Sequence, residues 1–419
     1  MRRIVILGGG PAGLEAARAA APHATVTLVS NLPPGTWRPL TGRIWLAAVA
    51  GGERDLATIT QRVDHACAMW QERAMAELEA LGVSIMNGYA RVFGTMVRVE
   101  LPDGAPEALL EADAVIIAAG AQDLYPDGLA PDGEQILNDA HLGVLTRIPA
   151  TTLVIGDGSI GFELCHIMSL LGSEVTWLVP EDAPRSFVAP PVDGYLTRLM
   201  ERQGVRMIPR TSVRRLNADG EAVHLVTAEG ARYGADVALL ARARHSDPTV
   251  FGLKSEDLAA DIYGQTKLRG VYLVGDALNP RTTSVAMAQG RAAALHAVGR
   301  SSGPAETSDI VVSFMKNPQV ARLGHIATEG SRNSITVSLT ESLAAYVENT
   351  LDGFLNLAWD QTGRVIGALA VAPQAAALLA PLALAMRMRL RLEDLADGYG
   401  PHPVLSELVA QAARKALVE

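Results

Sequence analysis

Short runs of consecutive apolar residues alternate with longer segments in which apolar residues recur every three or four positions. Runs at residues 4–7 and 153–155 predict buried strands, and the segments after them predict helices, because these two periodicities belong to covered strands and amphipathic helices. Residues 25–29 and 175–179 favour the next strands. The pattern therefore predicts two β-α-β units, one at the N-terminus and one beginning near residue 152.

The rest of the chain predicts further elements and four segments of domain structure. Other strands are expected at residues 83–85, 98–100, 113–118, 223–227, 236–240, 270–274, 310–314, 354–360 and 365–371, and other helices at residues 58–82, 284–298, 375–388 and 406–417. A proline-rich loop follows the first unit, and a Ser/Gly/Pro linker lies at residues 301–308. We predict a first nucleotide domain at residues 1–149, a second at 150–268, a return to the first at 269–304, and a C-terminal domain at 305–419.

Each β-α-β unit contains a glycine-rich turn between its first strand and its helix. The first turn has the sequence GGGPAG over residues 8–13, and the second has GDGSIG over residues 156–161. Glycine permits a tight turn and lets backbone approach a pyrophosphate, whose charge meets the helix N-terminus. Two such turns in a strand–turn–helix context predict two bound dinucleotides. For the second turn, a glycine-rich sequence kept for packing alone is the other interpretation.

Composition is typical of a globular protein with more than one domain. The chain has 419 residues, 49% of them hydrophobic, and a net charge of −9. This charge gives no indication of binding to nucleic acid or to an anionic membrane. Because the first strand begins near residue 3, we expect no signal peptide and a cytoplasmic protein. Cys67 and Cys165 lie in helical patterns and favour buried structural thiols, with no metal site.

Four further segments, taken in order along the chain with the two glycine turns, match the motifs of a known family. They are IIAAG at residues 116–120, ARAR at 241–244, VYLVGD at 271–276 and HPVLSE at 402–407. With the two glycine turns, the chain resembles the flavoprotein disulfide reductase family, of the dihydrolipoamide dehydrogenase and mercuric reductase type, over nearly its whole length. The resemblance implies an α/β fold: two Rossmann-like dinucleotide-binding domains, for FAD and NAD(P), and a C-terminal α+β dimerisation domain.

The resemblance also implies which residues contact the two cofactors. For FAD they are Gly8, Gly10, Pro11, Ala12, Gly13, Ser30, Ala119, Gly120, Gly275 and Asp276. For the nicotinamide nucleotide they are Gly156, Gly158, Ile160, Gly161, Glu163 and Ala243. Asp276 ends an apolar strand, at the sheet edge where ligands bind, and would accept a hydrogen bond from the ribityl chain of FAD. A helix N-cap is the plainer interpretation of this residue.

The chain departs from the family at the redox centre. The chemistry of the family usually depends on two cysteines spaced C-x4-C, and Trp37 and Gly42 occupy those positions here. Thiol–disulfide exchange needs an attacking and a resolving thiol, so we expect no disulfide reduction by the usual route. Leu46 stands near the position of the lysine that would pair with a glutamate such as Glu163 beside the flavin.

The acidic residue that normally ends the second strand and binds ribose hydroxyls is missing from both units. Ser30 takes its place in the first unit and can still form one hydrogen bond with ribose. Val179 takes its place in the second unit and can form none through its side chain. No arginine stands at that strand end, although Arg185 is nearby, so the sequence does not support a preference for NADP.

His402 and Glu407 form a candidate acid–base pair. In the family this histidine, oriented by this glutamate, acts on a thiol at the active site of the partner subunit, a role that suits a histidine beside a carboxylate. Without a thiol to deprotonate, the pair serves another substrate or a structural hydrogen bond at the dimer interface. The helix predicted at residues 374–388 is apolar on every face over 375–380, which favours a homodimer. Membrane contact is the weaker alternative, because no basic face accompanies the apolar one.

Two functions are consistent with these observations. The first is an FAD-dependent oxidoreductase that passes electrons from NAD(P)H through FAD to a non-disulfide acceptor, which is a small molecule or a protein. Trp37, Arg38 and Arg43 would line the acceptor side, unless they belong to a loop anchored by one aromatic residue. The second is a catalytically degenerate scaffold that acts as a binding or regulatory subunit. Bound flavin, and its bleaching by NADH or NADPH, distinguishes the two.

Overall fold

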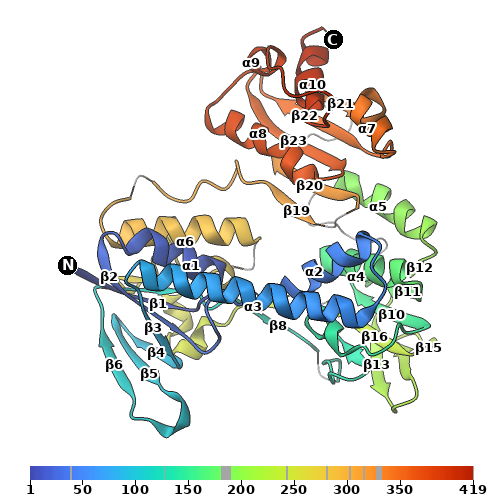
Figure 1. Ribbon diagram of the computed structural model, residues 1–419. Helices are drawn as coiled ribbons and strands as arrows, with labels where there is room; N and C mark the ends of the chain where they lie inside the picture. Colours follow the sequence, from blue (N-terminus) through green and yellow to red (C-terminus); the bar gives the residue numbers. More distant parts are fainter. Residues whose placement is uncertain are drawn as a thin grey trace. The chain divides into compact units, whose positions relative to one another are not determined.

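The computed structural model describes residues 1–37, 40–126, 128–180, 190–241, 244–279, 282–301, 303–314, 317–326 and 333–418. The chain forms two compact units, and Figure 1 labels their helices and strands. Unit 1 consists of residues 1–40, 61–124 and 243–307, and unit 2 consists of residues 41–60, 125–242 and 308–419. Helix α3 (Leu56–Ala80) begins in unit 2 and continues into unit 1.

A five-stranded parallel sheet in the order β18-β7-β1-β2-β3 forms the centre of unit 1. Its elements are β1 (Arg2–Leu7), α1 (Pro11–Ala20), β2 (Ala24–Ser30), β3 (Ser84–Asn87), β7 (Ala114–Ile117), β18 (Val271–Leu273) and α6 (Thr283–Ala297). An antiparallel meander of β4 (Tyr89–Phe93), β5 (Met96–Glu100) and β6 (Ala108–Glu111) accompanies it, with a short ladder of β8 (Gln122–Asp123) and β17 (Arg244–His245).

Alternate side chains of β1 pack into two different cores, which explains why residues 4–7 of this strand are all apolar. Ile4 and Ile6 pack with residues of α1 and α6, whereas Val5 and Leu7 pack with residues of the meander such as Val97. Both faces of the sheet are therefore covered, as is typical of parallel sheets. The carboxyl ends of its strands meet at one edge, where the glycine turn after β1 lies.

Unit 2 contains a second parallel sheet, in the order β12-β11-β10-β16-β9. Its elements are α2 (Leu40–Ala50), β9 (Ile136–Leu137), β10 (Thr151–Gly156), α4 (Gly158–Leu171), β11 (Glu174–Leu178), α5 (Pro190–Arg202), β12 (Arg206–Ile208) and β16 (Val237–Ala241). A separate antiparallel sheet is formed by β13 (Val213–Ala218), β14 (Val223–Thr227) and β15 (Arg232–Ala235).

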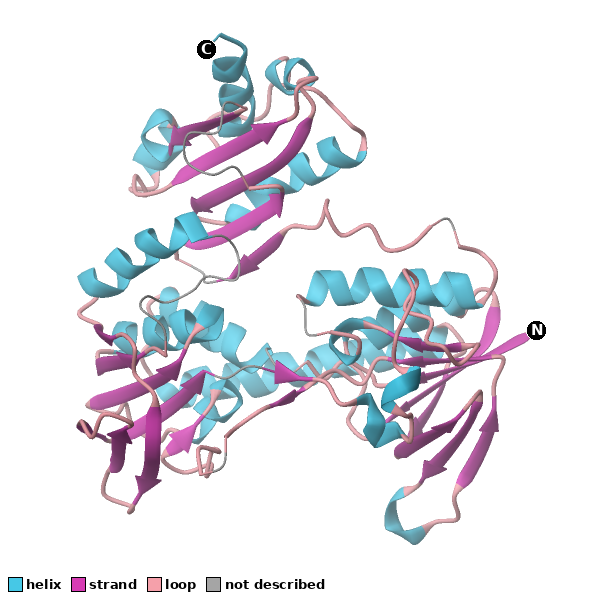
Figure 2. Cartoon of the chain, turned by 180° about the vertical axis from the view of Figure 1, so that it is seen from behind, coloured by secondary structure: helices cyan, strands magenta, loops and turns pink. Residues whose placement is uncertain are grey.

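The C-terminal part of unit 2 is an antiparallel sheet packed against helices, seen in Figure 2 as magenta strands and cyan helices. Its strands, in the order β19-β20-β23-β22-β21, are β19 (Val312–Phe314), β20 (Gln319–Gly324), β21 (Ser334–Ser338), β22 (Phe354–Trp359) and β23 (Val365–Ala372). Its helices are α7 (Leu343–Val347), α8 (Ala375–Arg387), α9 (Leu392–Ala396) and α10 (Glu407–Val418). Helices α8 and α10 bury their apolar faces against this sheet.

The structure confirms the predicted fold class: two parallel-sheet, Rossmann-like parts and a C-terminal α+β part. Several elements were missed by the sequence pattern. The loop expected after the first unit contains α2, whose Trp45 and Leu46 are buried and stabilise a helix that Pro39 and Gly42 obscured in the sequence. The strand predicted at residues 223–227 is β14, which lies in a separate antiparallel sheet. The pattern also missed β4, β6, β13, β15, β20 and β21, which are short or half-exposed.

Candidate functional site

The first glycine turn joins β1 to α1 in unit 1. The amide of Gly8 donates to the carbonyl oxygen of Val29 at 2.8 Å, which fixes the turn to β2. A β-carbon on Gly13 would overlap the Gly8 carbonyl oxygen, whereas one on Gly10 would meet nothing nearer than the Thr36 carbonyl oxygen at 3.8 Å. Backbone therefore fills the space beside Gly13, whereas the space beside Gly10 is open. This open front of Gly10 fits the approach of a pyrophosphate to backbone.

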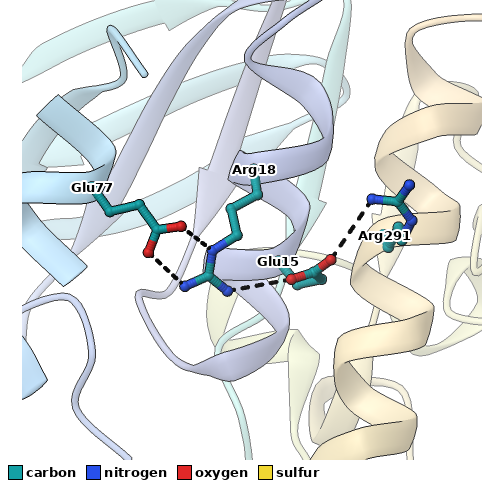
Figure 3. A network of polar contacts seen from close by, with 4 residues as sticks. All are labelled: Glu15, Arg18, Glu77 and Arg291. Atoms are coloured by element: carbon teal, nitrogen blue, oxygen red, sulfur yellow. Dashed lines mark hydrogen bonds and ion pairs between the residues drawn. The ribbon is translucent and has the colours of Figure 1, made fainter. Parts of the chain in front are cut away.

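An ion-pair network holds α1 to its neighbouring helices (Figure 3). Arg18 donates two hydrogen bonds to the carboxylate of Glu77 in α3, at 2.7 and 2.9 Å. Glu15 pairs with Arg18 at 3.3 Å and with Arg291 of α6 at 3.8 Å. The hydrogen bonds with Glu77 raise the pKa of Arg18, and the guanidinium lowers the pKa of Glu77. The helix that begins at Pro11, with Ala12 buried, is thus fixed on two sides.

Two side chains that the sequence analysis did not assign hold the Gly-Asp segment after β18. The guanidinium of Arg244 donates from Nη1 to the carboxylate of Asp276 at 2.6 Å, and from Nη2 to the carbonyl oxygen of Ala121 at 3.0 Å. The amide of Gly275 donates to Oε1 of Gln289 in α6 at 2.9 Å. Asp276 is therefore a fixed acceptor at the carboxyl edge of the sheet, where ligands of open α/β sheets bind.

Thr282 precedes α6 and has a buried hydroxyl. Its side chain makes no capping hydrogen bond, and Oγ1 is buried without a partner in the described part of the chain. Leaving such a hydroxyl without a hydrogen bond costs about 1–3 kcal/mol, unless a bound group forms that hydrogen bond. Together with the open front of Gly10, this orphaned atom shows that the residues of unit 1 fit FAD.

Ser30 ends β2, at the position expected for a ribose ligand. Its Oγ donates to the carbonyl oxygen of Leu32 at 2.7 Å and accepts a bond from the Leu32 amide at 3.3 Å. The hydroxyl proton is used by its own loop, so a ribose hydroxyl can only donate to Ser30. Ala119 and Gly120, the other expected FAD contacts, follow β7 at the same edge of the sheet.

The second glycine turn joins β10 to α4 in unit 2. Nε1 of the fully buried Trp177, in β11, donates to the carbonyl oxygen of Gly156 at 2.9 Å. A β-carbon on Gly161 would lie 3.0 Å from the indole ring, whereas one on Gly158 would meet nothing within 4 Å. In this turn too, one glycine is tightly packed and another is open. Here the indole of Trp177 fills the space beside Gly161, and the space beside Gly158 is open. Because a trans peptide points its N–H opposite to its C=O, the bond to Gly156 turns the Asp157 amide away from the indole.

Glu163 lies in α4, three residues after Ile160, and has a cationic partner. Its Oε1 accepts a bond from Nη1 of Arg43 at 2.5 Å, and both side chains are largely shielded from water. Arg43 lies in α2, one turn before the buried Leu46. Residues three apart share a helix face. Arg43 therefore supplies the positive charge that, by the family resemblance, a lysine near position 46 would bring to Glu163. Arg43 is therefore a helical, ion-paired residue and not part of an open loop.

Val179 follows β11 at the position of the absent acidic residue. It is fully buried, and its side chain brings no hydrogen-bonding group to the ribose end of the site. Three residues named in the sequence analysis, Ala243, Arg38 and Arg185, lie outside the described residues.

His402 and Glu407 form the hydrogen bond that their spacing suggests. Nδ1 of His402 lies 2.7 Å from Oε1 of Glu407, and the histidine side chain is 66% exposed. Arg414 fixes the segment before them: its Nε donates to the carbonyl oxygen of Ala396 at 2.8 Å, and its guanidinium lies 4.5 Å from the ring centre of Tyr399. The catalytic role of the pair stays a prediction.

The two cysteines differ in burial. Cys165 is completely buried in α4, and burial raises the pKa of its thiol well above the usual value. Cys67, in α3, is half-buried, so the expectation of two buried thiols was wrong for this residue; partial burial also raises the pKa of its thiol. Neither environment favours a reactive thiolate. In the described part of the chain, no three His, Cys, Asp or Glu residues gather to bind a metal, and no helix there is long and apolar enough to cross a membrane.

Comparison with known proteins decides the family. A model described as pyridine nucleotide-disulphide oxidoreductase matches residues 2–290, and the model of its dimerisation domain matches residues 313–413. The chain belongs to this family. Members of the pyridine nucleotide-disulphide oxidoreductase family are FAD-dependent and use NAD(P)H.

Several members of the family resemble this chain along its full length. One is an NAD(P)H dehydrogenase (quinone) of Mycobacterium tuberculosis, 28% identical, with 99% of this chain and 93% of the relative covered. Another is a dihydrolipoyl dehydrogenase of Mycoplasma pneumoniae, 25% identical, with 99% and 98% covered. Among solved structures, LpdA from Mycobacterium tuberculosis has a TM-score of 0.92 and 26% identity, with 99% of both chains covered.

Four residues of the site were missed or misplaced by the sequence analysis. They are Arg43, Trp177, Arg244 and Gln289. Arg244 ends the ARAR segment, so its motif was a signal for it. The other three act through partners that are 14 to 120 residues away in the chain, and a single sequence gives no sign of such pairs.

Proposed function

We propose that this pyridine nucleotide-disulphide oxidoreductase passes electrons from NAD(P)H through FAD to an acceptor that is not a disulfide, with quinones as the first class to test. The observation that carries the proposal is the replacement of the redox cysteines by Trp37 and Gly42. Neither Cys67 nor Cys165 compensates, because one is half-buried in α3, the other is fully buried in α4, and the pKa of each thiol is raised. The name of the 28% identical mycobacterial relative supports the quinone class.

Unit 1 supplies the groups for FAD. The open front of Gly10, the carboxylate of Asp276 and the hydroxyl of Thr282 would receive the pyrophosphate, the ribityl chain and a further polar atom of the cofactor. When bound, FAD supplies the redox chemistry, and the protein supplies position and access. Because Arg244 already fixes the carboxylate of Asp276, little side-chain entropy is lost on binding.

Unit 2 supplies the groups for the nicotinamide nucleotide. Gly156 and Gly161 pack tightly in the second glycine turn, whereas the space beside Gly158 at the N-terminus of α4 is open, which suits a dinucleotide pyrophosphate. The Arg43–Glu163 pair holds a carboxylate in α4 close to this turn. In this proposal the pair orients the nucleotide and takes no part in proton transfer. His402 has an exposed side chain, and Glu407 holds its Nδ1, so His402 is the candidate proton donor to a reduced acceptor.

The dimerisation domain supports assembly as a homodimer. One side of α8 packs on the C-terminal sheet, and the opposite side exposes the apolar Ala377, Ala380, Pro381, Leu384 and Met388. An apolar stripe of this kind is typical of a surface that a second protein covers. We infer that residues 305–419 form the dimerisation segment.

The test uses the purified full-length protein. We expect flavin absorption bands, bleached anaerobically by NADH or NADPH and restored by menadione, a simple quinone. The double variant Cys67→Ser/Cys165→Ala should retain this cycle, and lipoamide disulfide should not restore the oxidised bands. Protein without flavin bands would indicate the scaffold function, and dependence of turnover on either cysteine would overturn the non-thiol route.

A further inference from the structure

A short loop after β2 is held against the first glycine turn. The amide of Gly35 donates to the carbonyl oxygen of Gly9 at 2.8 Å. The group nearest to the open front of Gly10 is the carbonyl oxygen of Thr36, 3.8 Å from the place of a β-carbon. This carbonyl belongs to the peptide bond between Thr36 and Trp37. The backbone of Trp37 therefore begins beside the part of unit 1 that fits the pyrophosphate of FAD.

Helix α3 also holds this loop. Nε2 of Gln71 donates to Oγ1 of Thr36 at 3.2 Å, and a β-carbon on Gly35 would lie 3.2 Å from Cα of Gln71. After the loop, the amide of Leu40 donates to the carbonyl oxygen of Trp37 at 2.9 Å. None of these contacts uses the indole of Trp37, so they hold the loop without it.

The indole of Trp37 differs from the two most buried indoles of the protein. Trp45 and Trp177 are 0% exposed and belong to the core, whereas Trp37 is half-buried. A tryptophan that served only to anchor a loop would bury its whole ring, because burial of this large apolar surface is the source of its contribution. A half-buried ring on a fixed backbone instead presents a flat apolar surface, and little conformational entropy is lost when a ligand covers it.

We propose that the indole of Trp37 is the stacking surface for the ring of a quinone acceptor. This inference rests on the proposed function and names the residue that would recognise its acceptor. A quinone ring is planar, uncharged and electron-poor, and the face of an indole is electron-rich, so the two rings attract each other in an offset stack. An aliphatic side chain at position 37 would cover the quinone but would lack this electron-rich face.

Binding to the oxidised protein tests the proposal without turnover. In the absence of NAD(P)H the bound flavin cannot reduce menadione, so an absorption titration of the flavin-loaded protein with menadione measures binding alone. We expect a broad charge-transfer band at longer wavelengths than the flavin bands. Trp37→Leu should abolish this band and weaken menadione binding about three- to tenfold, the effect of one aromatic stack. Trp37→Phe, which keeps a planar ring, should bind more tightly than Trp37→Leu.

The matched control is Trp70→Leu. Trp70 also carries a partly exposed indole, 42% exposed, but it lies in α3, so its replacement should leave the band and the affinity unchanged. Equal affinity of wild type and Trp37→Leu would overturn the proposal. Loss of bound FAD from Trp37→Leu would overturn it too, because the indole would then belong to the cofactor site. Flavin that neither NADH nor NADPH reduces would refute the proposed function instead.

Discussion

The guanidinium of Arg43 lies 2.5 Å from the carboxylate of Glu163 and joins α2 to the helix that follows the second glycine turn. The two residues are 120 positions apart in the chain, and their side chains are 34% and 15% exposed. At this exposure the pair is screened less than a surface ion pair, so each charge contributes to the stability of the other.

A double-mutant cycle measures this dependence. Arg43→Gln and Glu163→Gln should each lower the free energy of unfolding by about 1–2 kcal/mol, and the double variant should lose less than the sum, because the second change removes a group that has already lost this ion pair. The measurement is urea denaturation. The Arg202–Asp352 pair is a control, since both of its side chains are more than half exposed and its coupling should be about 0.5 kcal/mol or less. Strict additivity for Arg43 and Glu163 would contradict the prediction.

Replacement of Trp177 by phenylalanine should weaken binding at the second glycine turn. The variant keeps an aromatic ring but leaves the Gly156 carbonyl oxygen without its donor, at a cost of about 1–3 kcal/mol. We expect a higher KM for the nicotinamide nucleotide, with unchanged FAD content and a smaller effect on kcat. Trp45→Phe is the matched control, because Trp45 is fully buried too, but its Nε1 has no partner among the described residues. Equal effects of the two substitutions on KM would show that ring packing, and not the hydrogen bond, is responsible.

The network in Figure 3 makes a prediction for unit 1. Arg18→Met removes the two hydrogen bonds to Glu77 and the contact with Glu15, and should lower the free energy of unfolding by about 1–2 kcal/mol. Arg91→Met is the control, since Arg91 meets Glu100 at 3.6 Å on an exposed strand and should change stability by less than about 0.5 kcal/mol. Thermal unfolding of the flavin-loaded protein provides the comparison, and similar effects of the two variants would argue against a role for the network.

Buried His166 makes stability depend on pH. Burial lowers the pKa of His166 below its usual value near 6.5, and a hydrogen bond from Nδ1 to Gln203 offsets part of this shift. Below pH 6.5 the unfolded chain therefore binds a proton that the folded chain does not, so stability falls as the pH is lowered from about 6.5 towards the folded pKa. His166→Gln should flatten this part of the stability curve, and its difference from wild type should be constant above about pH 7. A wild-type curve with the same slope as the variant would exclude this residue as the cause.

The exposed stripe of α8 predicts an effect on assembly. Leu384, whose side chain is 62% exposed, lies opposite the buried face of the helix, so Leu384→Glu should shift the dimer towards monomer without unfolding the C-terminal domain. Sedimentation velocity measures the shift, and circular dichroism checks the fold. Leu417→Glu, at an exposed apolar position of α10, is the control for the added negative charge. A monomeric wild type would remove the basis of this prediction.

The sequence predicted the parts of the molecule whose interactions are local. The glycine turns, the strands before them and the His402–Glu407 pair depend on residues close together in the chain, and their spacing is visible without a structure. The membership of β14 in a third sheet was not visible, since strand pairing is set by tertiary packing. Arg43 was assigned to a loop because Gly42 weakens the helical pattern locally, while the buried Trp45 and Leu46 stabilise the helix through contacts that a pattern does not contain.

The position of Trp177 gives the protein an optical signal of its own. An indole lies against Gly161 and holds the carbonyl of Gly156, so its fluorescence originates next to the second glycine turn. Reduced nicotinamide absorbs in the range where indole emits, and energy transfer would quench this emission when a nucleotide occupies the turn. The difference in fluorescence between wild type and Trp177→Phe therefore provides a label-free measure of nucleotide occupancy, independent of any electron acceptor.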